Sequence, residues 1–199
     1  MIRIVSIVNS IISSCTYIIL NDEQKEIWII DCGDIQPILD NLPRDFQLKG
    51  VLLTHTHYDH CYGLNSLLQQ YPDIKVYTNT YGREALESPQ LNLSKYHEDL
   101  PDFRMEKIVN VTDVNRIHEL NVEVIETPGH DPSCISFAIE KCLFTGDSYI
   151  PGCKLVCNFP HSNRKYAREN EWLLRQYEQR GYKIYPGHWI GYCPQKIIY

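Results

Sequence analysis

The chain has 199 residues, of which 43% are hydrophobic and 22% are charged, and its formal net charge is −6. This length and composition are typical of one globular domain over residues 1–199, and the 14 tyrosines argue against disorder. The charges are mixed in sign along the chain, so no basic stripe is available to neutralise phosphates. We therefore expect no nucleic-acid partner.

The N-terminal segment combines apolar residues with frequent serines and asparagines. Its β-branched pieces predict strands of the mature protein rather than a signal peptide. No apolar run approaches the ~20 residues needed to span a bilayer, so we expect no membrane association. The eight cysteines are irregularly spaced, which favours a reduced, cytoplasmic protein. Cys153 and Cys157 lie closest together, but no second pair completes a structural zinc site.

The first half of the chain alternates short β-rich runs with helical segments. Strands are predicted over 2–8, 15–20, 27–31, 48–54 and 74–79. A short helix is predicted over 37–43 and a second over 60–72, where Pro72 ends it. One face of the second helix carries three leucines, Leu64, Leu67 and Leu68. Residues 82–107 are weakly patterned and predict a short helix with a long loop.

The second half repeats this arrangement. Strands are predicted over 108–113, 117–120, 122–129, 134–140, 142–147 and 183–188. A helix is predicted over 164–180, with Trp172, Leu173 and Tyr177 as its buried face. Strands followed by a helix in each half predict an α/β fold in which two sheets lie face to face with helices outside.

Histidines and aspartates gather at the ends of several predicted strands. The segment "VLLTHTHYDHCYGL", residues 51–64, places four of them in six positions, and "TPGHD", "FTGDS" and "YPGHW" each place one more directly after a glycine. The seven residues are His55, His57, Asp59, His60, His130, Asp147 and His188. Imidazole nitrogen and carboxylate oxygen suit Zn²⁺. Seven ligands are too many for one tetrahedral ion, so the pattern predicts two ions that share one carboxylate.

The four motifs "THTHYDH" (54–60), "TPGH" (127–130), "FTGD" (144–147) and "YPGH" (185–188) together resemble the metallo-β-lactamase-fold superfamily of hydrolases. The resemblance implies a four-layer αβ/βα sandwich of two mixed β-sheets with outer helices. It also implies two sets of metal ligands: His55, His57 and His130 for one ion, Asp59, His60 and His188 for the other, and Asp147 as the bridge.

Particular residues favour one branch of this superfamily. A glutamate in place of His57 would be typical of the di-iron branch, and a cysteine in place of Asp147 of the true lactamases; neither is present. The chain looks most similar to glyoxalase II-like and lactonase-like enzymes. Only 11 residues follow His188, where glyoxalase II-like enzymes carry a helical domain that holds glutathione. This difference from glyoxalase II-like enzymes places a glutathione thioester in doubt as the substrate.

The resemblance and the ligand types predict a dizinc metallohydrolase that cleaves a small ester, thioester or lactone with a metal-bound hydroxide. Iron or manganese are alternative metals. Asp59 is the predicted catalytic residue that orients the nucleophile or accepts its proton, and Tyr149 either donates a hydrogen bond to the oxyanion or packs at a strand end. Two alternatives remain: a mononuclear iron persulfide dioxygenase of the same fold, and a non-catalytic binding domain.

Several other residues lie near the motifs without belonging to them. Lys154 and His161 lie in the loop after Asp147, where a substrate rim could form. We otherwise interpret His97, His118 and His161 as structural or solvated histidines. The bound partner is expected to be a small molecule, with its specificity set by loops 82–107 and 148–163.

Overall fold

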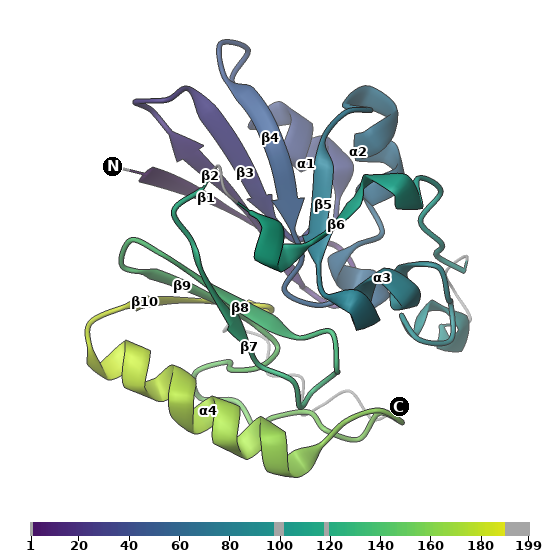
Figure 1. Cartoon of the computed structure of the whole chain (residues 1–199), viewed down its shortest axis with the longest axis vertical. Coiled ribbons are helices and arrows are strands. Elements are labelled where there is room, and N and C mark those ends of the chain that lie inside the picture. Colours follow the sequence, from purple (N-terminus) through teal and green to yellow (C-terminus); the bar gives the residue numbers. More distant parts are fainter. Residues whose placement is uncertain (1, 98–101, 118–119, 190–199) are drawn as a thin grey trace.

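The computed structural model describes residues 2–97, 102–117 and 120–189. Ten strands form two sheets (Figure 1). The six-stranded sheet has the order β1-β2-β3-β4-β5-β6 and consists of Ile2–Val8, Cys15–Asn21, Glu26–Ile30, Gln47–Leu52, Lys75–Thr78 and Val111–Asp113. Strands β1 to β3 pair antiparallel, whereas β3 to β6 pair parallel, so the sheet is mixed.

The four-stranded sheet has the order β10-β9-β8-β7, with β7 Glu123–Glu126, β8 Ile135–Ile139, β9 Cys142–Gly146 and β10 Lys183–Pro186. Here β7, β8 and β9 pair antiparallel, and β10 joins β9 in parallel. The parallel pairing brings the carboxyl ends of β9 and β10 to the same edge of the sheet.

Four α-helices cover the outer faces of the two sheets. Helices α1 Ile35–Asp40, α2 Leu64–Gln70 and α3 Thr80–Leu86 belong to the six-stranded half, and α4 Arg164–Gln179 lies on the outer face of the four-stranded sheet (Figure 1). The four layers are therefore helix, sheet, sheet and helix. This arrangement confirms the predicted α/β sandwich of two mixed sheets.

Strand β3 shows how the sequence separates the layers. Ile27 and Ile29 point to the helices, while Trp28 and Ile30 point to the other sheet, as the two-residue repeat of a strand requires. All four side chains are buried, so the strand reads as a continuous apolar run. Between the sheets, Trp28 and Ile30 belong to the same cluster of buried side chains as Phe137 of β8.

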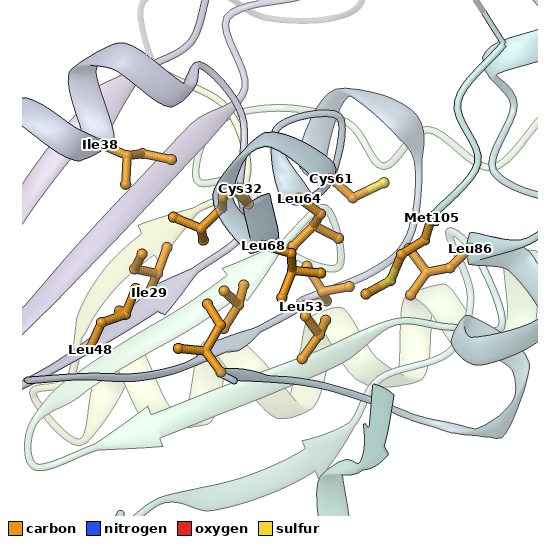
Figure 2. Close-up of a cluster of buried hydrophobic side chains, with 14 of the residues drawn as sticks. Ile29, Cys32, Ile38, Leu48, Leu53, Cys61, Leu64, Leu68, Leu86 and Met105 are labelled. Atoms are coloured by element: carbon orange, nitrogen blue, oxygen red, sulfur yellow. The ribbon is translucent and has the colours of Figure 1, made fainter. Parts of the chain in front are cut away.

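The outer core packs the predicted leucine face of α2 against the six-stranded sheet. Figure 2 shows Leu64 and Leu68 of α2 in one cluster of buried side chains with Leu53, Ile29 and, further along the sheet, Ile38 of α1. Leu67 is also fully buried, so the predicted face of this helix is confirmed. Burial of this size contributes roughly 1.5 to 3 kcal/mol per large side chain, which holds α2 and the segment before it on the sheet.

The buried face of α4 differs from the prediction. Trp172 is 66% exposed, whereas the residues that are buried are Ala167, Leu174 and Tyr177. Leu173 is only partly buried. Positions 167, 174 and 177 share one side of a helix, and position 172 lies about half a turn away from 174. The helix therefore turns the smaller leucine toward β7 to β9 and leaves the tryptophan outside.

Two predicted strands also need correction. Residues 108–113 begin with a 3₁₀ turn over Ile108–Asn110, and only Val111–Asp113 pairs as β6. Ile117 and Leu120 lie in no strand, and positions 118 and 119 of the predicted 117–120 strand fall outside the described residues, together with His118. Within the described part of the chain, no helix has both the length and the apolar character needed to cross a membrane.

Candidate metal centre

The four motifs meet at the carboxyl ends of strands from both sheets. The "THTHYDH" motif follows β4, "TPGH" follows β7, Asp147 follows β9 and His188 follows β10. Gly146 joins β9 to Asp147 with φ +49°, and a Cβ there would lie 2.5 Å from Thr54 Oγ1. A glycine is therefore required where the two sheet edges approach each other. The predicted convergence of these strand ends is present in the structure.

The first motif changes direction at a 3₁₀ turn over Tyr58–His60. His60 N donates to the His57 carbonyl over 2.9 Å, and this turn places His57 in one ligand group and Asp59 with His60 in another. The turn is anchored from behind, because Ser14 Oγ donates to the Asp59 carbonyl over 2.7 Å. One short segment thus supplies ligand atoms in two directions.

The structure brings all seven predicted side chains together. Three groups have ligand atoms within 4.8 Å of one another: His55, His57 and His130; His55, His60 and Asp147; and Asp59, His60 and His188. The first and third groups are the two predicted trios. That each of these residues binds a metal stays a prediction, but their positions fit it.

Asp147 lies between the two trios. Its Oδ2 is 3.2 Å from His188 Nε2 and 3.5 Å from His130 Nε2, and its Oδ1 is 3.6 Å from His60 Nε2. One carboxylate therefore faces imidazoles of both groups. This is the position that a bridging ligand would occupy.

Four of the five imidazoles have one nitrogen in contact with the protein and the other directed into the cluster. His130 Nδ1 donates to the Val156 carbonyl over 2.8 Å, and His188 Nδ1 donates to the Ile12 carbonyl over 3.0 Å. His55 Nδ1 lies 3.2 Å from Thr54 Oγ1. Such contacts fix the tautomer and orientation of a metal-binding histidine.

Two further carboxylates support the cluster from behind. His60 Nδ1 donates to Asp31 over 3.0 Å, and Thr54 donates to the same carboxylate through its backbone N and its Oγ1, each over 2.7 Å. Asp131 lies 3.5 Å from His57 Nε2. The sequence reasoning missed both residues. Asp31 ends a predicted strand as Asp147 does, and Asp131 directly follows His130, so their positions in the sequence were the available signal.

Burial and charge set the protonation of the cluster. Burial lowers the pKa of His130 to about 4 and, with the neighbouring His60 and His57, holds the pKa of His55 well below its usual value. Burial alone raises the pKa of Asp147, but its contacts with His188 and other imidazoles hold that pKa well below the usual range. Neutral imidazoles beside an ionised carboxylate are the forms that bind a cation.

His60 has the opposite tendency. Burial lowers its pKa, but the charges of Asp59, Asp31 and Asp147 outweigh burial and raise it to about 10. The imidazolium thus balances carboxylates that burial would otherwise leave uncompensated. A metal cation fits this position because it can replace the proton as the balancing charge.

The cluster also contains polar atoms that the protein leaves without partners. Among the described residues, His55 Nε2 and Asp147 Oδ1 are buried and have no hydrogen-bond partner. His57 Nδ1 and His130 Nε2 face each other at 3.0 Å, as do His60 Nε2 and His188 Nε2 at 3.4 Å. Buried polar atoms without a partner are costly unless a cation or a donor reaches them. The donor set therefore fits divalent metal.

The cluster forms the floor of a cleft of about 880 Å³. Asp59, His130 and His188 line it, whereas His55 and His60 are fully buried behind them. His97 lines the cleft too, and its Nδ1 is 3.2 Å from the Tyr58 hydroxyl, so it is closer to the site than the sequence indicated.

The loop after Asp147 forms one wall of this cleft. Lys154 is part of the lining, as the rim prediction required, but His161 is not and instead contacts the Tyr81 ring at a centroid distance of 6.1 Å. Cys153 and Cys157 lie in the same wall and join none of the three metal-ligand groups among the described residues. The cysteine pair therefore remains without support as a zinc site.

Tyr149 does not reach the cluster. Its hydroxyl donates to Glu178 Oε2 over 2.6 Å, and its ring packs with Leu174 of α4. Thr145 Oγ1 donates to its backbone carbonyl over 2.6 Å, which directs the chain toward α4. Tyr149 is absent from the lining of the cleft. This position does not support Tyr149 as an oxyanion donor, a role that stays a prediction, and it fits the alternative of packing at a strand end.

Residues 12–188 match the Metallo-beta-lactamase superfamily, and the chain belongs to that family. It is 31% identical over 137 residues to a hydroxyacylglutathione hydrolase of Aeromonas salmonicida, covering 68% of this chain and 47% of the relative. The chain thus spans about half the length of such relatives. It is also 27% identical to a probable metallo-hydrolase of Streptococcus pyogenes serotype M6, covering 94% of this chain and 84% of that protein.

Solved structures agree on the fold. The crystal structure of the BLEG-1 B3 metallo-beta-lactamase has a TM-score of 0.79 at 23% identity and covers 94% of this chain and 92% of its own. TTHA1623 in a di-iron-bound form has a TM-score of 0.71 at 21% identity, with 93% of this chain and 92% of that one covered. At these identities the likeness shows the fold alone.

Proposed function

We propose that the protein is a hydrolase that binds two zinc ions and cleaves a small ester, thioester or lactone. The observation that carries this proposal is the pair of ligand trios on either side of Asp147, at the floor of an open cleft. The similarity to hydrolases named as hydroxyacylglutathione hydrolase and probable metallo-hydrolase supports it.

The donor set supports zinc. The cluster offers imidazole nitrogen and carboxylate oxygen, and none of the three ligand groups includes a thiolate. Iron suits a similar donor set, and a structural neighbour holds two iron ions. Zinc is therefore the metal that we propose, and elemental analysis distinguishes it from iron.

Two bound divalent ions would polarise the scissile carbonyl and lower the pKa of a water molecule, so that a nucleophile forms near neutral pH. We assign the orientation of that nucleophile to Asp59. Its Oδ2 lies 3.4 Å from His60 Nε2 and 3.5 Å from His188 Nε2, and it lines the cleft. From there the carboxylate can accept the proton that the leaving group finally takes.

The dimensions of the cleft favour a small substrate. Its volume of about 880 Å³ falls in the usual range for small-molecule sites, and apolar residues such as Ile150, Val156 and Phe159 line the wall beside the metal ligands. We therefore propose a small acyl compound rather than nucleic acid as the substrate. A cytoplasmic location stays a prediction from the sequence.

Metal content and a substrate panel test this proposal together. Protein purified without added metal should contain about two zinc ions per chain and hydrolyse at least one member of a panel of esters, thioesters and lactones. One iron per chain with oxygen consumption on a persulfide would instead favour the dioxygenase alternative. Two zinc ions with no hydrolysis of any member would contradict the proposed activity.

A further inference from the structure

The wall of the cleft carries a group of cations. Apart from histidines, the charged residues that line the cleft in the described part of the chain are the two aspartates of the cluster and three basic residues: Asp59, Asp147, Lys154, Arg164 and Arg168. The chain as a whole has a net charge of −6. Positive charge is thus concentrated at the cleft of an acidic protein, and outside the metal ligands no carboxylate opposes it there.

These cations are not engaged by neighbouring carboxylates. Lys165 and Arg175, on the same helix, form ion pairs with Glu169 and Glu171 at 3.9 and 2.7 Å. Arg164 and Arg168 are exposed and pair with no acidic residue that the structure describes. Arg164 Nε instead donates to the Cys157 carbonyl over 3.4 Å. The two arginines are one helical turn apart and lie on the same face of α4.

The turn that carries the arginines is fixed to the metal centre. Asn163 N donates to the Gly129 carbonyl over 2.7 Å, and Ser162 Oγ donates to the His130 carbonyl over 2.6 Å. A Cβ on Gly129 would lie 2.5 Å from Ala167 Cα, so α4 rests directly on the "TPGH" turn. The first turns of α4 are therefore held at a constant position relative to His130.

We propose that Arg164 and Arg168, with Lys154 at the edge, bind an anionic end group of the substrate, a carboxylate or a phosphate, while the acyl bond lies over the metal ligands. The substrate part of this proposal rests on the proposed hydrolase function. Guanidinium groups present two parallel donors that match carboxylate and phosphate oxygens. The apolar wall between the arginines and the cluster, which includes Val156 and Phe159, would contact the rest of the molecule.

A binding experiment tests the subsite without requiring turnover. The metal-loaded protein is titrated calorimetrically with a butyl thioether that ends in a carboxylate and with its neutral amide counterpart. A second pair ends in a phosphate and in an alcohol, and it distinguishes the two sources of negative charge. The test variant is R164Q/R168Q. The control is K165Q/R180Q, which removes the same charge from α4 and its C-cap at residues that do not line the cleft.

Wild-type protein and the control should bind the anionic member of one pair about tenfold more tightly than the neutral member, and R164Q/R168Q should reduce this ratio to about threefold or less. The pair with the larger ratio identifies carboxylate or phosphate. Anions also bind metal directly, but this contribution is common to all three proteins. An unchanged ratio in R164Q/R168Q would overturn the proposal.

A parallel assay on hydrolysable thioesters separates the two proposals. If the metal-loaded protein hydrolyses neither neutral nor anionic thioesters, esters or lactones but keeps the arginine-dependent binding ratio, the hydrolase function fails and the anion subsite stands. The other outcome is hydrolysis in which the anionic-to-neutral ratios of kcat/KM and of binding affinity are the same in wild type and R164Q/R168Q. In that case the subsite fails and the hydrolase function stands.

Discussion

The floor and the wall of the cleft differ in how firmly their side chains are held. On the floor, His55 and His60 are fully buried and each imidazole has a protein partner behind it. On the wall, residues 148–163 form neither helix nor strand, and Lys154 and Arg164 are exposed. A rigid floor suits a metal centre, whose ligands must keep a fixed geometry, and an irregular wall suits substrate selection.

The largest effect is expected at the centre of the floor. Asp147→Asn removes the charge that faces both trios, so each would lose an anionic ligand and the repulsion between two dications would be unopposed. We expect a greater loss of metal than for any single histidine substitution. Elemental analysis after gel filtration measures this. A variant that retains two ions per chain with unchanged affinity would exclude the bridging position.

Asp59→Ala should affect turnover more than folding. The side chain lines the cleft, so its loss leaves the buried part of the cluster in place. We expect a loss of about 10²-fold or more in kcat on a confirmed substrate, typical for a residue that positions or deprotonates the nucleophile. Circular dichroism checks the fold. Full activity in a folded variant would assign that role to another residue.

A smaller effect is expected one layer behind the floor. Asp31→Asn weakens the contact that orients His60 and should lower metal affinity about 10- to 100-fold. Asp34→Asn is the matched control, because Asp34 accepts hydrogen bonds from Ser10 and Tyr62 instead. Competition with a coloured chelator compares the two. Equal affinities in both variants would mean that Asp31 does not support the metal centre.

The smallest effect is expected at Tyr149, which faces α4. Tyr149→Phe should leave kcat within about twofold of wild type, because its hydroxyl donates to Glu178 and is absent from the cleft. Loss of this bond should lower the free energy of unfolding by about 1 kcal/mol. Urea titration and steady-state kinetics measure the two quantities. A loss of 10²-fold in kcat would restore Tyr149 to the catalytic site.

The sequence predicted the floor far better than the wall, for physical reasons. Each floor residue lies in a short motif that follows or ends an apolar strand, and strand ends on one sheet edge must meet. Arg164 and Arg168 line the same cleft as Lys154 only because of the fold, since a loop and a helix contribute them separately. The sequence also could not predict which side of α4 is buried. Trp172 and Leu174 are both apolar, and contact with the sheet decides which of them is buried.

The central claim is that two metal ions lie on either side of Asp147, and anomalous diffraction from crystals of the metal-loaded protein tests it directly. Data collected on both sides of the zinc and iron absorption edges identify the element. We predict two zinc peaks, one among His55, His57 and His130 and the other among Asp59, His60 and His188. A single peak, or none at these side chains, would contradict it.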